Sequence, residues 1–131
     1  VAAQRDLTAI AAQAPWRDAL QARVEGAGAV ILGKDAARLP QTLGFAAQGF
    51  DAQMQVMGMD LAGIAISAGP ACSSGKMKPS DVVAAMGRAD LAPFAVRISG
   101  GWNTTEDDWI SAGDAWLELY ARHISRRKEV A

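Results

Sequence analysis

The residue with the clearest chemical potential is Cys72, the single cysteine of the 131-residue chain. It lies in the segment 67–75, with sequence SAGPACSSG, directly after a short apolar run at 64–66. Glycine, proline and serine at these positions predict a mobile loop that carries the thiol outward. Because a thiolate is a nucleophile, Cys72 is a candidate for sulfur or redox chemistry. The alternative is an ordinary free cysteine, since most behave as small buried hydrophobic residues.

The second candidate is Arg97, in the segment 94–99. Apolar side chains at 94, 96 and 98 alternate with those at 95, 97 and 99, and this period of two predicts a strand. Arg97 then lies on the face opposite Phe94, Val96 and Ile98, which is consistent with a side chain that points into a cleft. The alternative is a solvated strand arginine.

The composition favours a single globular domain and argues against several classes of binding site. Half of the residues are hydrophobic, which is enough for one core in one domain. A net charge of −1 gives no electrostatic case for nucleic acid or an anionic membrane. One cysteine cannot form an internal disulfide, and one cysteine with one histidine, His123, argues against a zinc site. We also expect no membrane span and no signal peptide.

Periodic apolar residues and capping residues outline the elements. They predict helices at 1–24, 51–59, 80–87 and 104–128, with Pro15 restarting the first helix and Asp51 capping the second. They predict strands at 29–32, 41–47, 64–66 and 94–99. We therefore expect one domain, 1–131, of the α+β class, with a small, mostly antiparallel sheet covered by helices.

Several side chains receive a structural interpretation. Thr104 with Asp107, or Thr105 with Asp108, is expected to form the capping box of the last helix. His123 is expected to be an ordinary surface or core histidine. The remaining large side chains are expected to pack in the core: Met54, Met57, Met59, Trp16, Trp102, Trp109, Ile110, Trp116, Leu117, Tyr120 and Ile124.

Four segments carry a resemblance to a known family. The segment 67–80, SAGPACSSGKMKPS, resembles the active-site cysteine loop of NifS/IscS-like cysteine desulfurases, which are pyridoxal-phosphate (PLP) enzymes of the class V aminotransferase group. Three further segments are similar to the family's pattern in the same order: 39–43 (LPQTL), 82–87 (VVAAMG) and 95–106 (AVRISGGWNTTE).

The resemblance implies that the chain is the C-terminal small domain of a fold-type I PLP enzyme. The large domain, with the lysine that binds PLP, would be absent, because Lys34, Lys76, Lys78 and Lys128 do not match that lysine's context. The isolated domain is then expected to be inactive. The resemblance also implies a cytoplasmic homodimer that passes sulfur from L-cysteine to an acceptor protein, as in iron–sulfur cluster assembly.

The family pattern implies a role for each candidate residue. Cys72 would attack the substrate sulfur and keep it as a persulfide, leaving L-alanine, and Arg97 would bind the substrate α-carboxylate. The pattern changes at Ala68, Pro70 and the segment 100–102, which leaves open a related lyase with another substrate such as selenocysteine. A non-catalytic domain that uses Cys72 as a sulfur-accepting or redox-sensing thiol is the third possibility.

Overall fold

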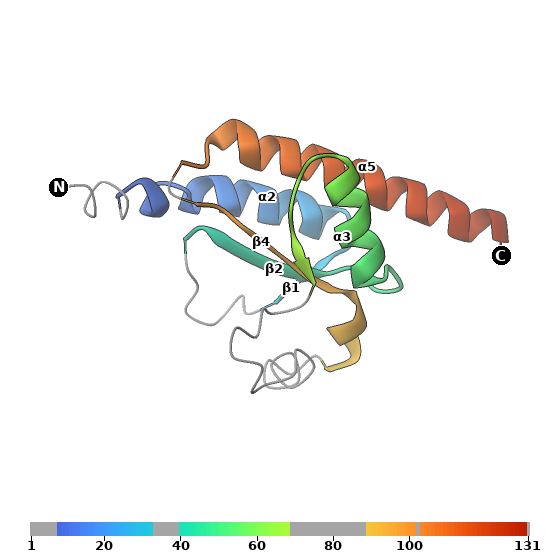
Figure 1. The fold of residues 1–131 in the computed structure, drawn as a ribbon. Coiled ribbons are helices and arrows are strands. Elements are labelled where there is room, and N and C mark those ends of the chain that lie inside the picture. Colours follow the sequence, from blue (N-terminus) through green and yellow to red (C-terminus); the bar gives the residue numbers. More distant parts are fainter. Residues whose placement is uncertain (1–7, 33–39, 69–88, 102, 131) are drawn as a thin grey trace.

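The computed structural model describes residues 8–32, 40–68, 89–101 and 103–130 (Figure 1). The elements, in chain order, are α2 (Ala14–Gly26), β1 (Val30–Leu32), β2 (Thr42–Ala46), α3 (Ala52–Leu61), β3 (Ser67–Ala68), the 3₁₀ helix η1 (Ala89–Phe94), β4 (Ala95–Ser99) and α5 (Glu106–Val130). This is the predicted α+β class. The predicted helix at 80–87 and the first residues of the predicted N-terminal helix lie outside the described residues.

The four described strands form one sheet in the order β1-β2-β4-β3, and each neighbouring pair is antiparallel. The long pairing is β2 with β4, which runs from Thr42 opposite Ser99 to Ala46 opposite Ala95. Helices α2, α3 and α5 all lie on the same side of the sheet (Figure 1). The prediction of a small antiparallel sheet covered by helices is therefore confirmed, with the helices on one face.

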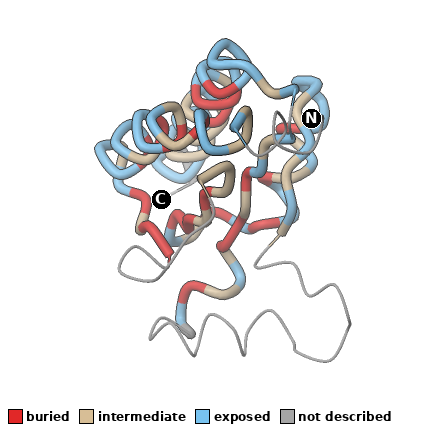
Figure 2. The backbone as a smooth tube through the Cα atoms, turned by 90° about the vertical axis from the view of Figure 1, so that its left-hand side faces the viewer, coloured by how far each residue is buried: buried red, intermediate tan, exposed pale blue. Residues whose placement is uncertain are grey.

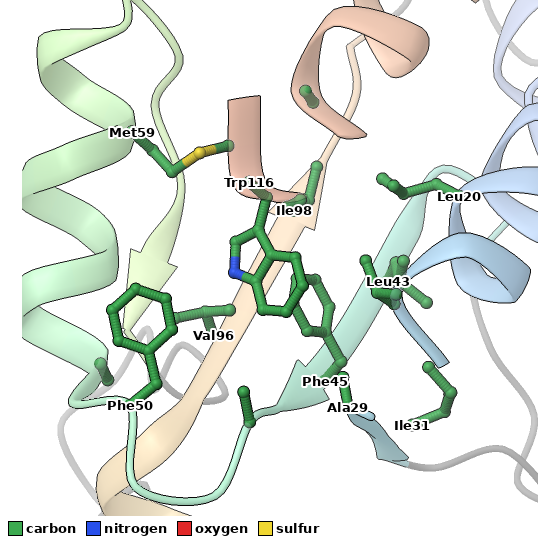
Figure 3. Close-up of a cluster of buried hydrophobic side chains, with 14 of the residues drawn as sticks. Leu20, Ala29, Ile31, Leu43, Phe45, Phe50, Met59, Val96, Ile98 and Trp116 are labelled. Atoms are coloured by element: carbon green, nitrogen blue, oxygen red, sulfur yellow. The ribbon is translucent and has the colours of Figure 1, made fainter. Parts of the chain in front are cut away.

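The core lies between the sheet and the three helices. Alternate strand residues point into it, namely Ile31, Leu43, Phe45, Val96 and Ile98. Trp116 of α5 is completely buried above them, and its ring meets that of Phe45 edge to face with centroids 5.0 Å apart (Figure 3). Buried positions in the tube of Figure 2 follow the strands and the inward turns of the helices. Strand alternation therefore decides which residues face the helices and which face away.

The helix ends follow the residues that the sequence offers for capping. The Asp51 side chain accepts hydrogen bonds from the backbone N–H groups of Gln53 and Met54 at the start of α3. At the start of α5, Thr105 and Asp108 form the capping box: the N–H of Thr105 donates to Asp108 Oδ2 at 2.9 Å, and the N–H of Asp108 donates to Thr105 Oγ1 at 3.2 Å. Of the two pairings that the sequence left open, the structure adopts this one.

The predicted strand at 64–66 is wrong. Gly63 has a φ of +85°, and the N–H of Ile64 donates to the carbonyl of Met59 at 2.9 Å. With the bond from the N–H of Gly63 to the carbonyl of Asp60, this is a Schellman motif, whose residue after the glycine is commonly hydrophobic. Ile64 is therefore apolar because it belongs to the end of α3, and the strand begins only at Ser67.

Four further side chains differ from the prediction. Phe94 belongs to η1 and packs with Leu91 in a small separate cluster, so it does not share the core face with Val96. The side chains of Met54, Met57 and Ile110 are 49%, 66% and 47% exposed. Helical spacing placed them in the core because it identifies a stripe but not the width of that stripe.

Candidate functional site

Arg97 lies in the middle of β4, on the sheet face that points away from the three helices. Its neighbours along the strand, Val96 and Ile98, are buried in the main core, so the period of two turns Arg97 to the other side. Across the sheet it stands between Gly44 of β2 and Ser67 of β3. Both flanking residues are small, which leaves lateral room for a guanidinium group.

The guanidinium of Arg97 is only partly satisfied by the described chain. The residue is half-buried, and its Nε atom is buried without a hydrogen-bond partner among the described residues. An unsatisfied buried donor costs about 1–3 kcal/mol, and more when it is charged. By contrast, Arg17, Arg23 and Arg122 lie on helices, and each forms an ion pair with a carboxylate. Arg97 thus has the capacity to bind an anion.

The same sheet face carries hydroxyl groups beside Arg97. One step along the ladder, Thr42 Oγ1 and Ser99 Oγ lie 3.3 Å apart as cross-strand partners. In the other direction, the face is closed by Leu91 of η1 against Ala46 and Ala95. The polar part of this face is therefore a short row of one cation and small hydroxyl side chains.

Cys72 lies outside the described residues, as do Lys76, Lys78 and Trp102. The structure does describe the strand that leads to the cysteine segment. In β3, Ser67 pairs with Arg97 and Ala68 pairs with Val96. The chain thus starts toward Cys72 from the strand next to Arg97, and this juxtaposition is not visible in the sequence.

Gly44 and Ser67 are the site residues that the sequence interpretation missed. Glycine is unfavourable inside a strand, so Gly44 counts against the predicted strand at 41–47. However, a glycine inside a strand often marks a place where another group comes close to the backbone. Its position directly opposite Arg97 supports that meaning. Only the strand register, which one sequence does not reveal, connects these two small residues with the arginine.

Two pockets formed by the described residues do not include Arg97 in their lining. One, of about 420 Å³, lies between α3 and α5 and includes the exposed side chains of Met57 and Leu61. The other, of about 260 Å³, lies near the end of β4 and the start of α5. Because neither is lined by Arg97, pocket size alone does not identify the site. Within the described ranges, there is no group of three or more His, Cys, Asp or Glu side chains that could hold a metal ion.

His123 is half-buried and stacks on Phe50, with ring centroids 4.4 Å apart. Its Nε2 atom is buried and has no hydrogen-bond partner among the described residues. It belongs to the aromatic group of α5 and lies on the helix side of the sheet, away from Arg97.

Among the helices that the structure describes, none is long and apolar enough to cross a membrane.

No family model matches the sequence, but comparison with known proteins finds relatives. A NifS protein of Halalkalibacterium halodurans is 33% identical over 101 residues, which cover 76% of this chain and 26% of the relative. The cysteine desulfurase IscS of Clostridium botulinum is 32% identical over 72% of this chain and 23% of its own length. The cysteine desulfurase IscS of Pseudomonas putida is 38% identical over 60% of this chain. The chain thus spans about a quarter of the curated relatives it matches.

Solved structures have the same fold. A NifS-like protein from Rickettsia africae matches 88% of this chain and 29% of its own, with a TM-score of 0.69 and 25% identity. A second NifS-like protein matches 83% of this chain with a TM-score of 0.67 at 22% identity, which shows the fold alone. The sequence relatives and the solved structures agree with the predicted resemblance, and they show that this chain is a NifS/IscS-like domain.

Proposed function

We propose that this chain is the small, C-terminal domain of a PLP-dependent cysteine desulfurase, and that it supplies the sulfur-accepting thiol and the group that binds the substrate carboxylate. The observation that carries the proposal is the position of Arg97. It is half-buried on the open sheet face, its Nε lacks a partner among the described residues, and the strand that leads to Cys72 pairs directly beside it.

Arg97 binds the α-carboxylate of L-cysteine in this proposal. A planar guanidinium forms two parallel hydrogen bonds with a carboxylate, which a lysine ammonium cannot reproduce. The small flanking residues, Gly44 and Ser67, leave space for the ligand at the sheet surface. A carboxylate at this position would also satisfy the buried donor of Arg97.

Cys72 accepts the sulfur atom. The sulfur of L-cysteine forms a bond with the Cys72 sulfur and its bond to carbon breaks, so that L-cysteine and the enzyme thiol give L-alanine and an enzyme persulfide. Cys72 is four positions beyond Ala68, the last residue of β3. Four residues span at most about 14 Å, so the thiol is tethered close to the strand that borders Arg97.

The cofactor is held by the part of the enzyme that lies beyond this chain. Among the described residues the one lysine is Lys128, which is exposed near the end of α5 on the helix side of the molecule. On the sheet face around Arg97, the described residues offer hydroxyl groups and no amine, so these residues do not fit the PLP site itself. When bound, PLP would supply the electron sink of the reaction. A sulfur-acceptor protein, a homodimer and a cytoplasmic location remain predictions.

The test uses the full-length protein, with alanine and sulfide measured after addition of L-cysteine. Arg97→Ala should raise KM roughly 10- to 100-fold while PLP binding is retained, because a charge-assisted pair of hydrogen bonds is lost. Arg97→Lys should recover only part of that loss. Arg126→Ala, which removes an exposed arginine on α5, is the matched control and should leave KM unchanged. An unchanged KM in Arg97→Ala would contradict the carboxylate role.

Cys72→Ala should abolish both sulfide release and the persulfide on the enzyme. Alanine formation at the original rate in this variant would overturn the assignment of the nucleophile.

The 131-residue chain alone should show no PLP absorbance band. Stoichiometric PLP binding by the chain alone would contradict a cofactor site in another part of the enzyme.

A further inference from the structure

Two buried glutamines connect α5 to the two ends of β4. At the end of the strand, the indole N–H of Trp109 donates to Gln13 Oε1 at 2.8 Å, and the amide of Gln13 donates to the carbonyl of Gly101 at 2.6 Å. Gln13 directly precedes α2, and its side chain is completely buried. The turn that follows β4 is thereby tied to both α2 and α5.

The second connection has the same chemistry at the other end of the strand. The indole N–H of Trp116 donates to Gln55 Oε1 at 2.8 Å, and the amide of Gln55 donates to the carbonyl of Phe94 at 3.1 Å. The same amide also donates to the carbonyl of Phe50 at 2.8 Å. Gln55 lies on α3 and is completely buried. Phe94 immediately precedes β4, as Gly101 closely follows it.

The chemistry of the groups fixes the direction of each connection. An indole N–H can only donate and a backbone carbonyl can only accept, so the glutamine must present its oxygen to the tryptophan and its amide N–H to β4. An apolar side chain of similar volume, such as that of methionine, cannot provide both functions. Leaving either group unpaired in the core is costly, which makes the two glutamines specific rather than interchangeable with apolar residues.

We propose that Gln13 and Gln55 are positioning residues for Arg97, an inference that rests on the proposed function of that arginine. The ladder with β2 holds β4 within the plane of the sheet, whereas the two glutamines fix both ends of β4 against the helix layer. Arg97 lies midway between Phe94 and Gly101. Because the side chain of Arg97 projects from the middle of β4 between the small residues Gly44 and Ser67, the placement of the strand backbone helps to set the position of the guanidinium.

The kinetic test replaces each glutamine by methionine in the full-length enzyme. Gln13→Met and Gln55→Met keep the volume but remove both hydrogen-bonding functions. KM for L-cysteine should rise about fivefold to tenfold with kcat changed less than about twofold, because substrate binding is weakened while the thiol is untouched. Gln53→Met, an exposed position on the same helix as Gln55, is the control and should match the unaltered enzyme.

Combining each glutamine variant with Arg97→Ala distinguishes a positioning role from a general effect on the structure. If the glutamines act through Arg97, they should raise KM no further once the guanidinium is gone. Equal increases with and without Arg97 would overturn the positioning role. If a glutamine variant does not fold, Trp109→Phe or Trp116→Phe removes the indole donor from the same connection and is subject to the same two outcomes.

Amide hydrogen exchange measures how firmly β4 is held, and this measurement does not depend on catalysis. Amide hydrogen exchange across residues 94–101 of the full-length enzyme should be about tenfold faster in Gln55→Met than in Gln53→Met. A rise in KM for Arg97→Ala with no change of exchange or KM in the glutamine variants would overturn this inference alone. An unchanged KM in Arg97→Ala would overturn the proposed function instead, and with it the need to position that side chain for substrate.

Discussion

Gly100 shows how closely the chain approaches itself next to the strand that carries Arg97. A Cβ atom at this position would lie 2.1 Å from Gln13 Oε1 and 3.2 Å from the Cβ atom of Thr104. Any side chain at 100 therefore displaces the amide that links Trp109 to the carbonyl of Gly101. The glycine is required here by this close approach, since its φ is not positive.

Gly100→Ala should lower the free energy of unfolding by about 1–3 kcal/mol, because it leaves a buried amide, indole or carbonyl group without its partner. Gly101→Ala is the matched control, since the nearest atom to its added Cβ, Asn103 Oδ1, is 3.6 Å away. Urea denaturation of the two variants measures the difference. Equal stabilities would mean that the Gln13 side chain adapts without losing its hydrogen bonds.

At the scale of elements, α3 and α5 begin where a short polar side chain accepts hydrogen bonds from N–H groups of the first turn. Asp51 does this for α3 through two backbone hydrogen bonds of 2.9 and 3.1 Å. Asp51→Ala should lower the free energy of unfolding by about 1 kcal/mol, the usual cost of losing an N-cap. Asp60→Ala, at the exposed last turn of the same helix, removes a charge from the negative end of the helix dipole and should be neutral or slightly stabilising.

The two aspartate variants of α3 are compared by urea denaturation under the same conditions. A loss of stability in Asp60→Ala as large as that in Asp51→Ala would contradict the capping role. Since α3 also supplies Gln55, a frayed start of this helix would weaken its hold on Phe94 as well. The cap therefore supports an element whose buried polar group reaches β4.

The elements that the sequence predicted are those whose signals are local. Asp51, the Thr105–Asp108 pair and the alternation of 95–99 each act within a few residues, and the structure has a cap, a capping box and a strand at these places. The segment 64–66 misled because an apolar residue after a helix-ending glycine looks the same as the start of a strand.

The candidate site is less visible in the sequence because its parts are brought together by register. Arg97 and Cys72 were identified from their segments, but Gly44 and Ser67 became site residues only through the pairing of three strands. The buried glutamines gave no signal at all, since glutamine is usually exposed and their tryptophan partners lie 96 and 61 positions away in the chain.

At the scale of the whole molecule, the sheet separates two kinds of surface. Its helix side contains the large core and the aromatic group around Trp116. The ring of Trp116 contacts that of Phe45 in β2 edge to face and stacks on that of Tyr120 in α5. Its other side carries Arg97 and the small hydroxyl residues. Most of the buried apolar residues thus lie on the helix side, whereas the other side holds only the small cluster around Leu91 and, beside it, the polar residues around Arg97. The buried glutamines are the hydrogen-bonded links between the helices and β4.

Trp116 is the residue on which this division most depends, because it packs on the sheet and also holds Gln55. Trp116→Ala should lower the free energy of unfolding by about 3–5 kcal/mol, a large share of the 5–15 kcal/mol typical of a domain. Ile110→Ala, on the same helix but 47% exposed, should change it by less than about 0.5 kcal/mol. Both residues belong to the same helical stripe in the sequence, so similar losses in urea denaturation would contradict the burial seen here and favour the broader core face that the spacing predicted.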